Sequence, residues 1–250
     1  LDRRDWYAAL ELSLVGNIFY YLCLAAAIQL AGAPLPTMII GTLPVVIAVV
    51  SNFHEGTLPW RRLLPSLGVI ALGIVLVNQQ ELALLQGVVT RDYVLGIVLA
   101  VCAMLCWTWY PVRNARWLKL RPQIRSDVWA TAQGLATLPL SLLGMLLAAW
   151  WFAGSSQFDF PLGPRPLLYA GLMLAIGLLA SWLGTLLWNR ASQLLPTALT
   201  GQLIVFETLA AFLYAFLWRG LLPGWLVLGG ITLLVIGVML GVRVFGQKVA

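Results

Sequence analysis

One carboxylate lies in the middle of an apolar segment. The stretch "QLIVFETLAAFLYAF", residues 202–216, surrounds Glu207 with side chains that favour the interior of a bilayer. A charged group at that depth is costly, and membrane proteins retain such groups mainly for ligand binding or ion transport. No Lys, Arg or His lies between residues 198 and 217, so Glu207 has no cationic partner within its own segment.

Three interpretations of Glu207 follow from this position. The carboxyl group is protonated and hydrogen-bonded to a neighbouring helix, it binds the ammonium group of a substrate, or it carries protons for coupled transport. An ionised side chain facing lipid is disfavoured, because hydrocarbon solvates charge poorly. Each of the three interpretations places Glu207 toward the protein interior or a water-filled cavity.

Further polar and aromatic side chains recur at helical spacing within apolar segments. Thr200, Glu207 and Tyr214 follow one another at seven-residue intervals, which would place them on one face of a continuous helix. Similar stripes occur in the other segments. We therefore predict a substrate cavity without catalytic residues, lined by Asn17, Tyr20, Tyr21, Trp107, Trp109, Tyr110, Gln133, Trp182, Thr185, Asn189, Gln202 and Glu207.

The same residues also have a structural interpretation. Ser and Thr often bond to the backbone of their own helix, small residues pack helices together, and Tyr and Trp gather at membrane interfaces. The stripes together favour a cavity for a ligand with an aromatic or apolar body and a small polar head. Phosphorylated ligands fit poorly, because the apolar segments hold no Lys or Arg at mid-depth.

Two prolines are placed to bend the helices around this cavity. Pro44 and Pro139 lie inside apolar segments, where proline removes a backbone donor and favours a kink. Bent helices can act as gates in a transporter. A purely geometric bend is the alternative interpretation.

The elements that carry these residues are predicted to be membrane-spanning helices. Hydrophobic residues make up 61% of the sequence and charged residues 10%, whereas soluble domains carry about 25% charge. Runs long enough to cross a bilayer recur along the chain, without the strict alternation typical of barrel strands. The prediction is an all-α polytopic membrane protein with eight spans, at about 9–31, 36–53, 62–79, 94–112, 127–152, 166–189, 197–218 and 224–245.

The basic residues indicate how these spans are oriented. Three of the 15 Lys and Arg residues, Arg91, Arg165 and Arg219, fall in one set of alternate connections. The others fall in the opposite set, which the positive-inside rule assigns to the cytoplasm together with both ends of the chain, in a bacterial inner membrane. Topology and lipid anchoring then account for the formal charge of +6, and nucleic acid is not an expected partner. The cytoplasmic set comprises Arg3, Arg4, Arg61, Arg62, Arg113, Arg116, Lys119, Arg121, Arg125, Arg190, Arg243 and Lys248.

The sequence contains few residues that could bind a metal or a cofactor. Cys23, Cys102 and Cys106 lie inside apolar spans without metal-ligand spacing, and the single histidine, His54, lies in a predicted cytoplasmic turn. We expect neither a metal nor a cofactor. The expected partners are a small-molecule substrate and membrane lipids, and the oligomeric state is left open.

An internal repeat organises the chain. Residues 44–76 align without gaps with residues 208–240, so that "GTLP" falls on "GLLP" and Gly73 falls on Gly237. Just upstream, "LPT" occurs in both copies, at residues 35–37 and 195–197. Spans one to three therefore correspond to spans six to eight.

The repeat predicts two five-helix units of opposite orientation. The second copy has two additional spans before the aligned block, so by symmetry we expect two helices before Leu1 and ten in the intact protein. An odd number of crossings inverts the next copy, and inverted repeats are typical of secondary transporters. The expected organisation is the end of the first repeat at residues 1–80, an extracytoplasmic connection at 81–93, and the second repeat at 94–250.

The chain resembles a known family in both copies. The run "LLWNRASQLLPTALTGQLIVFETLAA" and the segment "PVVIAVVSNFHEGTLPWR", with Glu55 after the span, are similar to the EamA-type drug/metabolite transporters. The resemblance covers essentially the whole chain, and the aromatic-rich composition looks most like the YddG-type aromatic amino acid exporters. It implies a ten-helix transporter. The chain departs from the family pattern at Arg219, where a Glu is expected, and at Thr208, where Pro is usual.

The leading hypothesis is therefore export of small amphipathic metabolites, above all aromatic or apolar amino acids, through a central cavity by alternating access. A transporter of other drugs or metabolites is one alternative. A membrane-embedded enzyme acting on a lipid or amphipathic substrate is disfavoured, because no nucleophile–base pair or phosphate-binding loop is visible. A structural subunit would not explain the repeat or the polar stripes.

Overall fold

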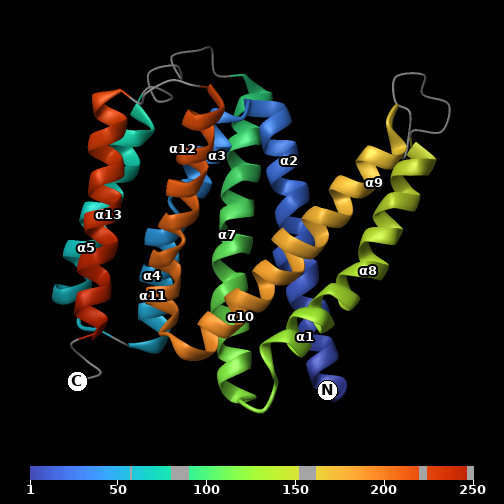
Figure 1. The fold of residues 1–250 in the computed structure, drawn as a ribbon, viewed down its shortest axis with the longest axis horizontal. Coiled ribbons are helices and arrows are strands. Elements are labelled where there is room, and N and C mark those ends of the chain that lie inside the picture. The colour runs from blue at the N-terminus through green and yellow to red at the C-terminus, as the bar shows by residue number, and fades with distance from the viewer. Residues whose placement is uncertain (57, 80–89, 152–161, 220–223, 247–250) are drawn as a thin grey trace. The chain divides into compact units, whose positions relative to one another are not determined.

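The fold is described from a computed structural model over residues 1–56, 58–79, 90–151, 162–219 and 224–246 (Figure 1). Within these ranges the regular structure is helical, with no strand. Seven helical stretches are long and apolar enough to cross a membrane, which confirms an all-α polytopic membrane protein. They are Arg3–Ala31, Leu35–Glu55, Trp60–Val77, Arg91–Leu120, Ser126–Trp151, Pro166–Leu194 and Trp225–Gly246.

The helices divide into two compact units, each with its own internal packing. Unit 1 consists of residues 1–18 and 113–194, and unit 2 consists of residues 19–112 and 195–250. Each unit combines segments from both predicted repeats, so the units are packing units and do not correspond to the repeats. The repeat boundaries stay a prediction.

Unit 1 is built around a long helix, α8. Helix α1 packs along α8, and α10 packs on it from another side. Residues 166–183, which precede α10, carry mostly apolar side chains that are exposed, as expected for helices that face lipid. The elements of unit 1 are α1 (Arg3–Ser13), most of the π-helical segment η1 (Leu14–Phe19), the end of α7 (Arg91–Leu120), α8 (Ser126–Trp151), α9 (Pro166–Ala175), the π-helical segment η2 (Ile176–Leu183) and α10 (Gly184–Leu194).

Unit 2 contains two broken helices. The predicted second span is interrupted at Thr42 and the predicted seventh at Ile204, so each consists of two shorter helices. The elements of unit 2 are α2 (Tyr20–Ala31), α3 (Pro34–Gly41), α4 (Leu43–Glu55), α5 (Trp60–Val77), the first part of α7, α11 (Thr197–Leu203), α12 (Val205–Arg219) and α13 (Trp225–Gly246).

Helices α5 and α13 lie side by side and run in opposite directions (Figure 1). A methyl group added at Gly73 would lie 2.9 Å from the Gly230 carbonyl oxygen and 3.0 Å from Leu234, so the backbones touch there. Gly237 in turn faces Ile70 and the carbonyl oxygen of Ser66. Small residues of this kind allow helices in membranes to pack closely.

These glycine contacts have the symmetry of the sequence repeat. The alignment that pairs Gly73 with Gly237 also pairs Ser66 with Gly230 and Ile70 with Leu234. The neighbours of Gly73 are therefore the aligned equivalents of the neighbours of Gly237. A two-fold axis between inverted copies requires this symmetry, in which each glycine contacts the residues equivalent to those that the other contacts.

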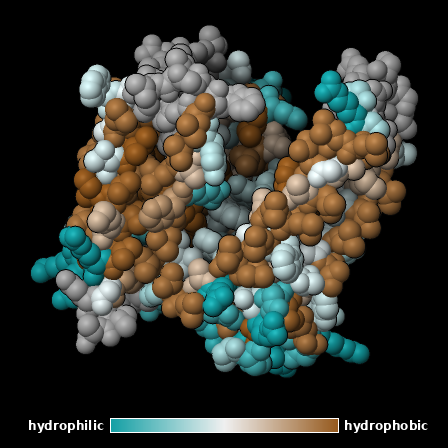
Figure 2. All heavy atoms as spheres, viewed as in Figure 1, coloured by the Kyte–Doolittle hydropathy of each residue, from teal (hydrophilic) through white to brown (hydrophobic). Residues whose placement is uncertain are grey.

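Apolar side chains cover the lateral surfaces of the helices. Figure 2 shows hydrophobic residues along the visible flanks of α8 and α9, with hydrophilic residues gathered at helix ends. Leu167, Leu174 and Trp225 are among the large apolar side chains exposed in this way. In water such surface would drive aggregation, whereas in a bilayer it faces lipid.

Candidate functional site

An aromatic ladder joins α2 to α7 within unit 2. The rings of Tyr20 and Trp107 stack with centroids 4.9 Å apart, and Trp107 stacks on Tyr110 at 5.2 Å and an angle of only 3°. Tyr21 meets Tyr20 edge-on at 4.9 Å. Tyr20 and Tyr110 are buried, Trp107 is half-buried and Tyr21 is largely exposed. We call Tyr21, Tyr20, Trp107 and Tyr110 the aromatic ladder.

The ladder depends on close approach of its two helices. A methyl group at Gly96 of α7 would lie 2.6 Å from the Ala31 side chain of α2, so a larger residue would force the helices apart. Helix α7 also contacts the break between α3 and α4. At this break the Thr42 hydroxyl donates to the Ile39 carbonyl at 2.6 Å and lies 3.4 Å from the Met104 sulfur of α7. The ladder and this break are thus attached to the same helix.

The breaks place Pro44 and Glu207 each in the first turn of the helix that follows a break. Pro44 lies in the first turn of α4, just after Thr42. Glu207 lies in the first turn of α12, and its backbone N–H donates to the Ile204 carbonyl at 2.9 Å. The single continuous helix assumed for the seven-residue stripe is therefore wrong: Thr200 is buried in α11, whereas Glu207 and Tyr214 are exposed on α12.

Glu207 lies on α12, in the same unit as the aromatic ladder. Its side chain is exposed and makes no hydrogen bond or ion pair within the described part of the chain. Trp109, also on α7, is half-buried.

A second cluster is the buried amide network of unit 1. The Asn114 side-chain oxygen accepts bonds from Trp129 Nε1 at 2.8 Å and Gln133 Nε2 at 3.0 Å. Its Nδ2 donates to the Asn189 side-chain oxygen at 2.8 Å. The Ser13 hydroxyl donates to the Gln133 carbonyl and attaches α1 to the network. Among the described atoms, Asn189 Nδ2 is buried without a partner.

Three other predicted lining residues lie in the same unit. Asn17 donates to the Thr137 hydroxyl at 3.2 Å, and Trp182 donates to the Thr131 hydroxyl at 3.0 Å. Thr185 is half-buried on α10. Asn17 and Trp182 occupy π-helical segments, which often mark functional positions. Pro139 lies inside α8, which continues past it as a helix.

Gln202 is enclosed where three helices of unit 2 meet. Its Nε2 lies 3.4 Å from the Ser66 hydroxyl, and its side-chain oxygen is buried without a hydrogen-bond partner in the described region. A methyl group at Gly241 would overlap that oxygen at 1.8 Å. Only glycine fits beside Gln202, so this part of the predicted lining is packed by protein.

A contact that the sequence did not predict joins the ends of α4 and α11. The Thr197 hydroxyl donates to the Glu55 carboxylate at 2.5 Å. Nearby, the Asn52 side chain makes two bonds with the Leu58 backbone, and Gly56 adopts the left-handed conformation that ends α4. The resemblance singled out Glu55, but only folding brings Thr197 to it.

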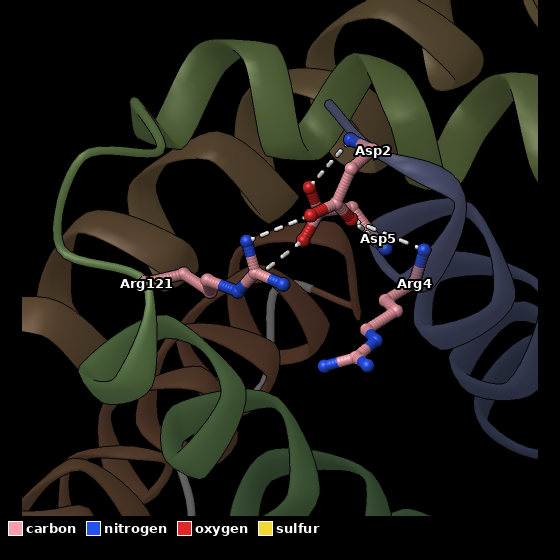
Figure 3. A network of polar contacts seen from close by, with 4 residues as sticks. All are labelled: Asp2, Arg4, Asp5 and Arg121. Carbon is pink, nitrogen blue, oxygen red and sulfur yellow. Dashed lines mark hydrogen bonds and ion pairs between the residues drawn. The ribbon is translucent and has the colours of Figure 1, made fainter.

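An ionic cluster at the start of α1 was also not predicted (Figure 3). The Asp2 carboxylate accepts the backbone N–H groups of Arg4 and Asp5 and the Arg121 guanidinium, at 3.0–3.1 Å. These bonds, chiefly the one from the Asp5 N–H, hold the pKa of Asp2 below its ordinary value of 3.8. Arg121 also lies 3.9 Å from the buried Asp5 and over the ring of Trp117.

The described residues hold no group of three or more His, Cys, Asp or Glu side chains that could bind a metal ion. Cys23, Cys102 and Cys106 are half-buried free thiols. Cys23 lies on α2, and Cys102 and Cys106 lie on α7, where Cys106 directly precedes Trp107 of the ladder.

The fold and these two clusters define a multi-pass α-helical membrane protein. No protein-family model matches the chain. It is 52% identical over 256 residues to the inner membrane protein YtfF of Escherichia coli (strain K12), an alignment that covers 99% of this chain and 79% of that protein. The chain therefore belongs to the YtfF family of inner membrane proteins.

A solved crystal structure has the same fold. It matches 100% of this chain and 79% of its own length, with a TM-score of 0.75 and 17% sequence identity. At that identity the likeness concerns the fold alone. Together with the relative, it indicates a multi-pass protein of the inner membrane.

Proposed function

We propose that this protein is a transporter of the EamA-type drug/metabolite class that exports small amphipathic metabolites, with aromatic and apolar amino acids as its main substrates. The observation that carries the proposal is the aromatic ladder together with the two broken helices of unit 2. Broken helices at membrane depth are typical of transporter sites, because they present free backbone groups to a ligand.

The symmetric α5–α13 contact supports alternating access. Two inverted copies can exchange conformations, so a site near their axis opens to one side of the membrane at a time. Gly73 and Gly237 occupy equivalent places in that contact. The described residues offer no phosphate-binding cation at mid-depth in unit 2, which supports substrates with small polar groups.

We further propose that both ends of the chain lie in the cytoplasm. The cluster of basic residues at the end of α7 and in the following turn supports this orientation, because such residues gather on the cytoplasmic side. Two of them, Arg113 and Arg121, pair with Glu11 of α1 and with its N-cap Asp2. Export then requires the site to accept substrate from that side.

Flux into proteoliposomes tests the proposal. Purified protein should move labelled phenylalanine or leucine down a gradient, and Trp107→Leu should lower the rate about tenfold by removing the centre of the ladder. Trp225→Leu, which alters an exposed tryptophan at the start of α13, is the matched control and should retain the rate. Absence of flux for every aromatic and apolar amino acid would contradict the substrate class.

A further inference from the structure

The two broken spans of unit 2 share one short sequence pattern. The segment "LPTMIIG", residues 35–41, ends in α3, and "LPTALTG", residues 195–201, ends in α11, so Gly41 is the equivalent of Gly201. The alignment of the segments that follow makes α12 the equivalent of α4, and Ala211 the equivalent of Ile47. A contact between α4 and α11 therefore has one aligned counterpart, which is a contact between α12 and α3.

Helices α4 and α11 pack closely on each other (Figure 1). A methyl group at Gly201 would lie 2.6 Å from Cγ2 and 3.0 Å from Cβ of Ile47. Residues 197–202 of α11 are all buried, and the Thr197 hydroxyl donates to the Glu55 carboxylate at 2.5 Å. This contact therefore closes unit 2 where α4 ends.

The counterpart contact is not made. No comparable packing joins α3 to α12 among the described residues, and none of their atoms lies within 4 Å of a methyl group placed at Gly41. None of residues 37–42 is buried, and Ala211 is exposed, whereas its equivalent Ile47 is fully enclosed. The shared pattern is thus packed in one half of the repeat and open in the other.

Inverted copies of one pattern can exchange their contacts, because each half can adopt the conformation of the other. A glycine in a membrane helix allows a second helix to approach closely. Gly41 provides such a surface on α3, but in this structure nothing in the described region occupies it. The same helix face in the other half, at Gly201, shows which contact it can make.

We propose that the protein has a second conformation in which α3 packs on α12, with Gly41 against Ala211, while α4 and α11 separate. The bond between Thr197 and Glu55 is broken in that conformation. The inference rests on the proposed transport function and identifies the two helix contacts that alternate during transport.

The side that is closed in this structure follows from the same contact. Arg61 and Arg62 start α5, directly after the turn that ends α4. In the proposed orientation these residues are cytoplasmic, so the structure is the conformation closed toward the cytoplasm. The second conformation is closed on the opposite side and accepts substrate from the cytoplasm.

Pairs of introduced cysteines test the second conformation without a substrate. In a full-length chain with the three native cysteines replaced by alanine, Ile47→Cys with Gly201→Cys joins the contact of this structure. Gly41→Cys with Ala211→Cys joins the aligned contact. A disulfide needs Cβ atoms roughly 3.5–4.5 Å apart, so mild oxidation in proteoliposomes should join the first pair quickly and the second pair more slowly but completely.

Two matched controls accompany the second pair. Leu213→Cys replaces Ala211→Cys in one chain and lies on another face of α12, so it should not form a disulfide with Gly41→Cys. Gly201→Ala places a methyl group against the stiff Ile47 side chain, and separation of α4 from α11 should speed oxidation of the second pair about tenfold. Gly68→Ala, which meets nothing within 4 Å, should leave that rate unchanged.

Failure of the second pair to form a disulfide even with Gly201→Ala would overturn the inference. So would equal oxidation of the Leu213→Cys control, or equal rates with Gly201→Ala and Gly68→Ala. If the Gly41→Cys chain does not fold, Thr37→Cys with Arg219→Cys, the aligned equivalents of Thr197 and Glu55, provides the decision.

The inference and the proposed function can fail separately. Flux of phenylalanine without a disulfide in the second pair would leave transport standing and refute the proposed contact. The expected disulfides without flux of any aromatic or apolar amino acid would support the second conformation and contradict the substrate class.

Discussion

Asn114 makes three side-chain hydrogen bonds with two atoms, and all four participating side chains are buried. In a low-dielectric interior each bond is strong, and each unpaired donor is costly. Trp129 and Gln133 come from α8 and Asn189 comes from α10, so one residue fixes the relative placement of three helices of unit 1.

We expect Asn114→Leu to destabilise the protein more than any single loss of an exposed bond. It leaves the Trp129 indole N–H buried without its acceptor and removes the bonds to Gln133 and Asn189, at a cost of about 3 kcal/mol. Thr131→Val is the matched control, because it removes only the partly exposed bond from Trp182 and should cost less than about 1 kcal/mol. Thermal unfolding in detergent measures both, and equal losses would contradict this account.

The Asp2 cluster predicts a dependence on acid. Because the folded-state pKa of Asp2 lies below 3.8, its bonds contribute stability that is present above that pH and lost as pH falls through the lower folded-state value. Asp2→Asn keeps a capping side chain that cannot titrate. The stability of this variant should therefore fall less than that of the wild type as the pH is lowered through 3.8, the ordinary pKa of Asp. Asp92→Asn, at the start of α7, controls for the loss of one charge. A wild-type slope in Asp2→Asn would contradict the assignment.

At the scale of elements, the sequence predicted the helices well and their interruptions poorly. Long apolar runs define spans because a bilayer fixes their length. Within the described residues, seven of the eight predicted spans coincide with a helical stretch long and apolar enough to cross a membrane, whereas the predicted span 197–218 is divided into α11 and α12. Pro44 indicated one interruption, because proline removes a backbone donor. Nothing in the apolar residues around Ile204 indicated the other, since that break is set by packing.

The sequence predicted which residues of the candidate site share a helix, but it did not predict the contacts between helices. Helical spacing brought Tyr20, Tyr21 and Tyr110 into the prediction, since residues on one helix face can be recognised from intervals alone. Trp107 was predicted because it lies too deep in its span for a residue of the membrane interface. The stacking of α2 on α7 depends on Gly96, and the Asn114 network depends on three helices. Contacts of that kind arise from tertiary packing and leave no periodic signal.

The glycine contacts between α5 and α13 predict a graded response to alanine. Gly73→Ala and Gly230→Ala place a methyl group 2.9 Å from a backbone carbonyl oxygen, which cannot move aside, so each should destabilise by about 1–3 kcal/mol. Gly68→Ala in α5 and Gly229→Ala in α13 meet nothing within 4 Å and should be neutral or slightly stabilising. Thermal unfolding in detergent separates the two pairs, and similar values for all four would refute the close contact.

At the scale of the whole molecule, the distribution of basic residues predicts the orientation of the chain in the membrane. A topology with both ends in the cytoplasm predicts that a reporter fused after residue 246 is active only if it functions in the cytoplasm. The same reporter inserted after residue 162, in the connection before α9, should show the opposite activity. A periplasmic signal from the C-terminal fusion would require the opposite orientation.

The contact between α5 and α13 has a consequence for biosynthesis. Helix α5 ends at Val77 and its partner begins at Trp225, so the ribosome must add the intervening chain before the pair can form. At usual rates of synthesis this takes roughly 10 to 30 s. Throughout that interval the small-residue face of α5 lies in the bilayer without its partner, open to membrane proteases and to wrong helix pairings. Helix α13, which is made long after α5, therefore completes the packing of α5.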